Sequence, residues 1–104
     1  MDHSADDLVH AASPCGGLTV TTTPDGIPVS VRIGRAQLSV TPERLAARIV
    51  ALCAVARAGA DHRHRLHLIE RGTPAETLDA LGLASRRRVV ELEESAAALW
   101  GVRR

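Results

Sequence analysis

The sequence has almost no aromatic residues and no lysine. Phe and Tyr are absent, Trp100 is the single tryptophan, and all 13 residues of the Lys and Arg class are arginine. Proteins that bind single-stranded nucleic acid stack the bases on aromatic side chains, and this chain has hardly any to offer. Because the chain has arginine and no lysine throughout, the choice of arginine over lysine at any one position carries no functional information.

Cysteine and long apolar runs are also scarce. The two cysteines, Cys15 and Cys53, form no Cys-x-x-Cys motif, and we expect both to be reduced, without a bond between them. The longest apolar stretch, residues 49–56, is far too short to span a bilayer. The N-terminus carries acidic residues and lacks the basic and apolar regions of a secretory signal. We therefore expect a cytoplasmic protein with no membrane contact.

No catalytic or nucleotide-binding pattern is present. Gly16-Gly17 has no surrounding G-x-G-x-x-G or Walker sequence, and no nucleophile elbow or His/Cys pairing occurs. We predict that the chain is not an enzyme and has no cofactor and no small-molecule substrate. Its 104 residues, 45% hydrophobic and 24% charged with a net charge of +1, are typical of one globular domain.

The clearest pattern is the alternation in "LTVTTTPDGIPVSVRI", residues 18–33. Pro24-Asp25-Gly26 has the residues of a tight turn, so the segment predicts a β-hairpin. An isolated hairpin is marginal in water, and its apolar face needs a cover. The residues expected on that buried face are Leu18, Val20 and Thr22 before the turn and Ile27, Val29, Val31 and Ile33 after it.

A long helix is the expected cover. Thr41-Pro42-Glu43 provides an N-cap hydroxyl, a proline for the first turn and an acid near the positive end of the helix. The helix is expected to run to about Glu70 and to end at Gly72. Its apolar stripe includes Leu45, Ile49, Leu52, Cys53 and Ala56, with Arg44 and Arg48 expected on the opposite, polar side.

Two shorter helices are expected after Gly72. Thr73-Pro74 with Glu76 has the pattern of a capping box, followed by an amphipathic turn with Leu78, Leu81 and Leu83 that stops at Gly82. A final helix is expected from about Ser85 to Leu99. The sequence thus predicts a single α+β domain, 1–104: a flexible or short edge element in 1–16, a hairpin plus long helix in 17–71, and C-terminal helices in 73–100.

This order of segments is similar to that of a known family. The runs "LTVT", "IPVSVRI" and "GRAQLSV", followed by "TPERLAARIVALCAVARA", resemble the YbaB/EbfC family of small bacterial dimers, described as nucleoid-associated DNA binders. Residues 18–57 look most like the core of actinobacterial type VII (ESX) secretion-associated proteins of the EspD/EspH type. Asp25-Gly26 matches the hairpin turn of that group, and Trp100-Gly101 resembles its ending.

The resemblance implies a small antiparallel sheet covered by a long helix and a non-enzymatic protein-interaction module, accessory or chaperone-like, in type VII secretion. Its partner would be a secretion component or a substrate. The alternative that it implies is a nucleoid-associated DNA-binding protein with low sequence specificity. A secreted substrate of that pathway would need a Tyr-x-x-x-acid signal, and the chain has no tyrosine.

A homodimer is expected because the long helix has more apolar surface than a small sheet can cover. The predicted interface residues are Leu45, Ile49, Leu52, Val55 and Trp100. Trp100 has two interpretations, as an anchor of the last helix in the core or as an interface hot spot.

Two polar clusters are open to more than one interpretation. His64 and His67, with Asp61 or His62, are weak candidates for a metal site or a pH-sensitive interface, although a solvated helix face also explains them. The arginine cluster consists of Arg86, Arg87 and Arg88 with Arg103 and Arg104. It suits phosphate groups of DNA or RNA, an acidic protein, or a solvated helix with pairs such as Arg87 and Glu91.

Overall fold

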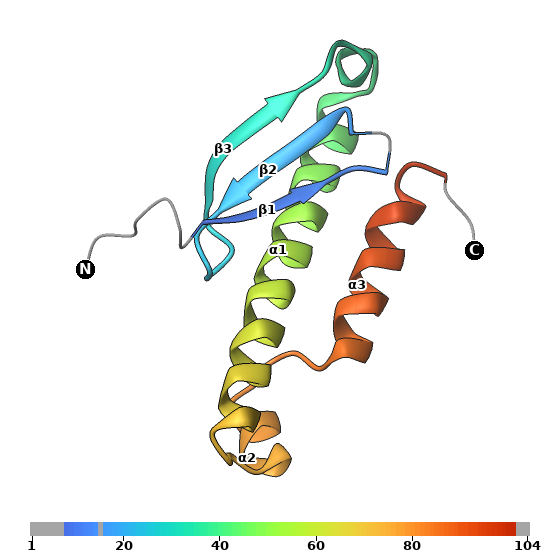
Figure 1. Ribbon diagram of the computed structural model, residues 1–104. Helices are drawn as coiled ribbons and strands as arrows, with labels where there is room; N and C mark the ends of the chain where they lie inside the picture. The colour runs from blue at the N-terminus through green and yellow to red at the C-terminus, as the bar shows by residue number, and fades with distance from the viewer. Residues whose placement is uncertain (1–7, 15, 102–104) are drawn as a thin grey trace.

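A computed structural model describes residues 8–14 and 16–101 and confirms the predicted α+β class (Figure 1). A three-stranded sheet lies across one half of a long helix, and a third helix runs beside that helix. In chain order the elements are β1 (Val9–Ala12), β2 (Leu18–Thr22), β3 (Pro28–Ile33), the 3-10 helix η2 (Arg35–Ser39), α1 (Pro42–Glu70), α2 (Ala75–Ala80) and α3 (Arg86–Ala98).

The sheet is antiparallel with strand order β1-β2-β3. β1 pairs with β2 with Val9 opposite Thr22, and β2 pairs with β3 with Leu18 opposite Ile33. The predicted turn between β2 and β3 is confirmed, because Gly26 has φ +85° and its N–H donates to Thr23 O at 2.9 Å. The edge element expected before residue 17 is a strand, β1.

The predicted long helix is confirmed at both ends. Thr41 caps α1, since its hydroxyl oxygen accepts the N–H of Arg44 at 3.3 Å, and Pro42 is the first helical residue. The helix ends at Glu70, and Gly72 follows with φ +90°, a backbone conformation that favours glycine. α1 is therefore a continuous 29-residue helix.

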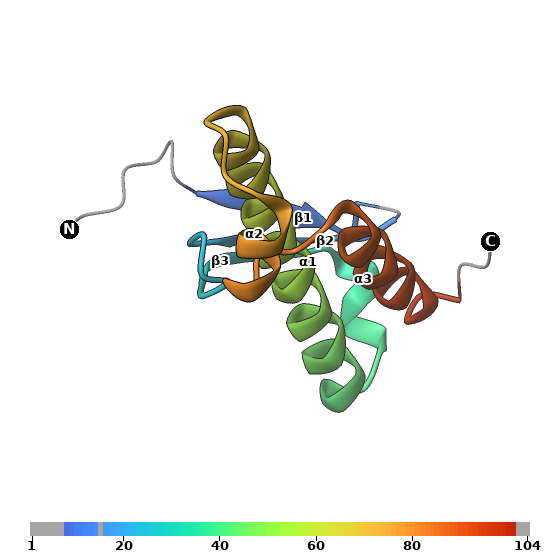
Figure 2. The ribbon, with the colours of Figure 1, turned by 90° about the horizontal axis from the view of Figure 1, so that it is seen from below.

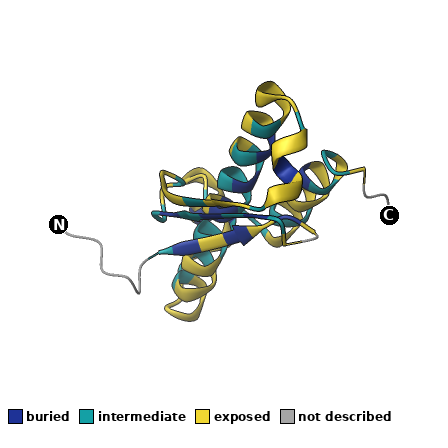
Figure 3. Cartoon of the chain, turned by 90° about the horizontal axis from the view of Figure 1, so that it is seen from above, coloured by how far each residue is buried: buried dark blue, intermediate teal, exposed yellow. Residues whose placement is uncertain are grey.

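The core lies between the sheet and α1. α1 contacts β1 and β2 on one side and α3 on another, as the view from below shows (Figure 2). Buried and exposed residues alternate along β1, as expected for a strand with one covered face (Figure 3). The buried cluster consists of Val9, Ala11, Leu18, Val20, Leu52 and Ala56.

The buried face expected for the second hairpin strand is wrong for three of its four residues. Val31 is half-buried, but Ile27, Val29 and Ile33 are 60%, 57% and 43% exposed. α1 lies mainly under β1 and β2, and an irregularity in the pairing at Thr21 and Thr22 shifts the start of β3. The inner side of β3 therefore extends beyond the helix that covers the other two strands.

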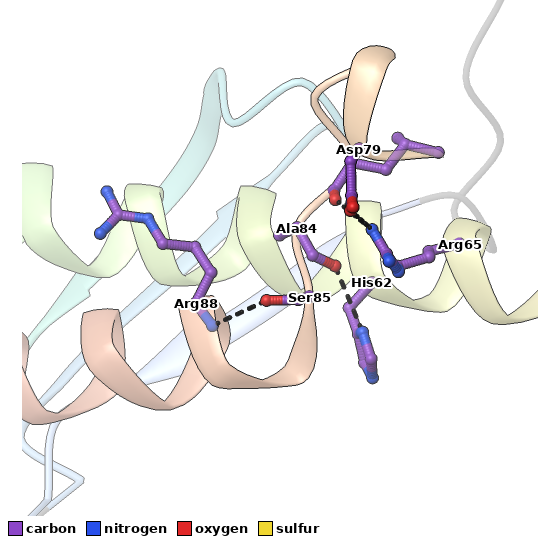
Figure 4. A network of polar contacts seen from close by, with 7 residues as sticks. His62, Arg65, Asp79, Ala84, Ser85 and Arg88 are labelled. Atoms are coloured by element: carbon purple, nitrogen blue, oxygen red, sulfur yellow. Dashed lines mark hydrogen bonds and ion pairs between the residues drawn. The ribbon is translucent and has the colours of Figure 1, made fainter. Parts of the chain in front are cut away.

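The capping box predicted for α2 does not form, because Pro74 occupies the N-cap position and has no side chain that can accept a bond. Leu78 is buried as expected, whereas Leu81 is 64% exposed. Contacts from α1 hold this region in place (Figure 4). Arg65 Nη1 donates to Asp79 Oδ1 at 2.7 Å and to Leu83 O at 3.1 Å, and His62 Nδ1 lies 3.3 Å from Ala84 O.

The final helix begins as predicted. The hydroxyl oxygen of Ser85 accepts the N–H of Arg88 at 3.2 Å, so Ser85 is the N-cap of α3 (Figure 4). Leu99 is the C-cap, and Gly101 follows with φ +75°. α3 packs beside α1, and its last turn lies near the β1 edge of the sheet.

Alanine substitutions at two glycines test the packing of the fold. A Cβ at Gly34 would lie 2.9 Å from Gly17 O, a backbone atom that accepts the Gly34 N–H at 2.7 Å, whereas a Cβ at Gly59 in α1 would meet nothing within 4 Å. We expect Gly34→Ala to lower the free energy of unfolding by about 1–3 kcal/mol through overpacking. Gly59→Ala should raise it by about 0.5–1 kcal/mol. Urea denaturation measures both, and changes of the same sign would contradict this packing.

Candidate protein-binding site

An open groove of about 420 Å³ lies between β1 and α3. β1 is the strand nearest α3 in Figure 1. The floor of the groove is apolar and consists of Leu52 and Val55 from α1. Its two walls are His10, Ala11, Ala12 and Pro14 on the sheet side and Glu93, Ala96, Ala97 and Trp100 on the α3 side. We call this feature the β1–α3 groove.

The sheet-side wall is the outer edge of β1, with which no strand of the described residues pairs. Ser13 N–H donates to Leu18 O at 2.8 Å, so the peptide groups of Leu18 point toward β1. Because peptide groups alternate in direction along an antiparallel strand, Val9 and Ala11 also bond to β2. The N–H and C=O groups of His10 and Ala12 therefore point away from β2, at the edge that borders the groove.

The opposite wall is made of small residues. Ala96 is buried and Ala97 is half-buried, and both lie in the last turn of α3, while Glu93 one turn earlier is exposed. Alanines leave room beside β1 that longer side chains would fill. The groove thus combines unpaired backbone groups on one wall, an apolar floor and a carboxylate at the rim.

Arg48 holds the end of α3 in place. The prediction that Arg48 lies on the polar side of α1 is wrong, because the residue is only 7% exposed. Its position three residues after Leu45 and four before Leu52 places it on the apolar stripe itself. Arg48 Nη1 donates to Gln37 Oε1 at 2.8 Å, and its Nε and Nη2 donate to Leu99 O at 3.3 and 3.1 Å.

The buried charge of Arg48 has no carboxylate partner among the ion pairs of residues 8–14 and 16–101. Neutral groups of negative character surround it instead. Leu99 O lies at the C-terminus of α3, where the helix dipole is negative, and the guanidinium carbon lies 4.9 Å from the centre of the Trp100 ring. Gln37, from η2, is buried with it. One side chain therefore joins η2, α1 and the end of α3.

Trp100 belongs to the core and to the groove at once. It is half-buried, packs against the core cluster and lines the groove. Its indole N–H is the one buried side-chain polar atom without an acceptor in the described part of the chain. Such a group costs about 1–3 kcal/mol, so stacking on Arg48 and apolar contacts must hold the ring in place.

Three of the five predicted interface residues, Leu52, Val55 and Trp100, line the groove. Leu45 and Ile49 pack against the core cluster and do not line the groove. The sequence reasoning missed His10, Ala12, Glu93 and Ala97. The apolar residues Leu8, Val9, Ala11 and Ala12 within the short edge element expected in 1–16 are the sequence signal for β1, but nothing local to either segment places β1 beside α3.

The side chains of Asp61, His62, His64 and His67 do not converge on one point. His64 and His67 are exposed, His62 lies against Ala84 O, and Asp61 is 4.0 Å from Arg57 Nε. Within residues 8–14 and 16–101, no three His, Cys, Asp or Glu side chains gather closely enough to hold a metal ion. Cys53 is a free, half-buried thiol, and burial raises its pKa. Cys15 lies outside the described residues.

The arginine cluster lies at the start of α3. Arg86, Arg87 and Arg88 are exposed, and Arg87 Nε lies 3.9 Å from Glu91 Oε1, the pair expected from their spacing. Arg88 also lines a shallow pocket with Arg57 and Asp61, so an acid accompanies the arginines there. Arg103 and Arg104 lie outside the described residues.

The importance of Arg48 can be measured against a neighbouring arginine. Arg44 lies one turn earlier on α1 and is exposed. We expect Arg48→Ala to lower the free energy of unfolding by about 2–4 kcal/mol, since Leu99 O and Gln37 Oε1 lose a charged donor. Arg44→Ala should change it by less than about 0.5 kcal/mol. Equal losses in urea denaturation would show that the buried cluster does not hold α3.

No helix in the described ranges is long and apolar enough to cross a membrane. The chain matches no family model, no curated protein and no solved structure. The resemblance to the YbaB/EbfC family therefore stays a prediction from the sequence pattern.

Proposed function

We propose that the chain is a non-enzymatic protein-interaction module that binds an extended segment of a partner protein in the β1–α3 groove. The observation that carries this proposal is the free edge of β1 beside an apolar groove. Extended peptides add to such edges as a further strand, with affinity from main-chain hydrogen bonds and specificity from alternate side chains. The groove offers both, through His10 and Ala12 at the edge and Leu52 and Val55 on the floor.

The groove also defines the chemistry of its partner segment. Successive side chains of an added strand point to opposite faces, so every second one would face the apolar floor. Alanines on the wall favour small or medium apolar side chains at those positions. The exposed carboxylate of Glu93 favours a basic residue at the rim. We therefore propose an alternating apolar segment with at least one basic residue.

A role as an accessory or chaperone-like protein fits this mode of binding, because an added strand is recognised mainly through its backbone. Such a site can hold a partner segment before that segment reaches its final structure. The link to type VII secretion comes from the sequence resemblance, and under this proposal the bound segment belongs to a secretion component or a substrate. The predicted cytoplasmic location suits that role.

Selected peptides test the proposal. Peptides are selected on the purified chain from a displayed random library, and their binding is measured by fluorescence anisotropy. We expect Ala97→Arg, which fills the groove, to weaken binding at least about tenfold, as a loss of about 1.4 kcal/mol or more would. Ala46→Arg, at an exposed position of α1 outside the groove, is the matched control and should bind as wild type does.

A second variant separates loss of the edge from loss of fold. His10→Pro removes an N–H that points away from β2, so the β1–β2 pairing keeps its main-chain bonds and loses only the 3.0 Å contact of His10 Nδ1 with Thr21 Oγ1, while the incoming strand loses one bond. Circular dichroism confirms that each variant is folded. Failure to select any peptide, or equal binding by Ala97→Arg, His10→Pro and wild type, would overturn the proposal.

A mobility-shift titration tests the DNA-binding alternative, which predicts that the chain retards duplex DNA. With a net charge of +1 and Glu91 beside Arg87, we expect no retardation of duplex DNA even at low salt, where counterion release favours binding most. Retardation that disappears when Arg86, Arg87 and Arg88 are all replaced by Gln would support a nucleoid-associated role instead.

A further inference from the structure

Among residues 8–14 and 16–101, no strand pairs with the outer side of β3, the second edge of the sheet. Gly34 N–H donates to Gly17 O at 2.7 Å, so the peptide groups of Gly17 point toward β3. By the same alternation Arg32 and Ser30 bond to β2, while Val31 and Ile33 direct their N–H and C=O groups away from the sheet. Pro28 at the start of β3 has no N–H to donate, so the strand bonds available at this edge are those of Val31 and Ile33.

Apolar side chains accompany this edge. Val29 and Ile33 on β3 are 57% and 43% exposed, and Val50 on α1 is 68% exposed. Val50 lies on the hairpin side of α1, because it shares a helical stripe with Cys53 and Arg57. A Cβ at Gly26 in the hairpin turn would contact both of those residues. The exposed apolar groups thus lie along one border of the molecule, beside the free edge.

We propose that a second copy of the chain occupies this edge, with the two β3 strands antiparallel about a two-fold axis at Val31. In this register Val31 pairs with Val31 of the second copy, and Arg32 pairs with its Ser30. The outward peptide groups of Val31 then meet their own counterparts, as a two-fold interface requires. Val31 then lies opposite an apolar residue on the inner side of the sheet, where α1 leaves β3 uncovered.

Charge on the outer face of the sheet distinguishes this register from its neighbours. With the axis at Val31, Arg32 lies opposite Ser30 of the second copy. With the axis at Arg32, two arginines would lie directly opposite each other, which is unfavourable. With the axis at Ser30, Arg32 would lie opposite Pro28 and Ser30 opposite Ser30. The Val31 register avoids the like charges of the Arg32 axis, and unlike the Ser30 axis it does not bring Pro28, which has no N–H, into the middle of the pairing.

The interface differs from the one expected from the sequence. Leu45, Ile49 and Leu52 pack within their own chain, whereas the β3 border remains uncovered. Pairing would produce a six-stranded sheet with β1 at each end. The dimer would therefore present two β1–α3 grooves, one at each end, and this consequence rests on the proposed function. The dimer itself does not depend on peptide binding.

Two opposite substitutions at the exposed Ser30 test the register. Sedimentation equilibrium from about 1 µM to about 1 mM chain gives the dimer dissociation constant. We expect wild type to dimerise within this range. Ser30→Glu should lower the dissociation constant about 2- to 30-fold, because it places two Glu-Arg pairs across the interface, and Ser30→Arg should raise it by a similar factor.

A rescue completes the test. Arg32→Glu added to Ser30→Arg restores opposite charges across the interface and should restore dimerisation. A wild-type chain that stays monomeric throughout the range would overturn the proposal and leave β3 to a different protein. Weakening by both Ser30 variants, or no change with either, would overturn the Val31 register. Anisotropy with a selected peptide reports on the groove separately, so the two proposals can fail independently.

Discussion

The shape of the β1–α3 groove depends on the burial of Arg48. Its guanidinium group joins Gln37, Leu99 and Trp100, and no carboxylate is among its partners in the described part of the chain. The negative end of the α3 dipole and the face of an indole ring offset part of the cost of desolvating the charge. Because the same contact fixes the last turn of α3, it also fixes the wall of the groove that Ala96 and Ala97 form. An apolar residue at position 48 could fill the space but would leave Leu99 O without its donor.

In the described part of the chain the sheet has three strands, and its two edges are unpaired for different reasons. At β1, α3 stands apart from the strand and leaves a groove with an apolar floor. At β3, α1 does not extend far enough to cover the inner side, and apolar side chains reach solvent. Free edges promote pairing, and we propose that both edges of this small domain are binding surfaces. A partner segment suits the first, and a second copy suits the second.

Much of this fold follows from local sequence. The Pro24-Asp25-Gly26 turn, the Thr41-Pro42 start of α1 and the Ser85 cap of α3 each act within a few residues, and all form as predicted. The burial of Arg48 and the exposure of β3 were not predicted, since both depend on which part of α1 faces which strand. The groove was only partly foreseen, through Leu52, Val55 and Trp100. Its other wall requires β1 and α3, which are distant in sequence, to lie on the same side of α1.

Amide hydrogen exchange followed by NMR, with and without a selected peptide, tests the groove most directly. In the free chain the amides of His10 and Ala12 should exchange quickly, because they point away from β2, while those of Val9 and Ala11 are protected. Bound peptide should protect His10 and Ala12 and leave Val31 and Ile33 as they were. A peptide that binds without protecting His10 and Ala12 would contradict the assignment of the β1–α3 groove as the binding site.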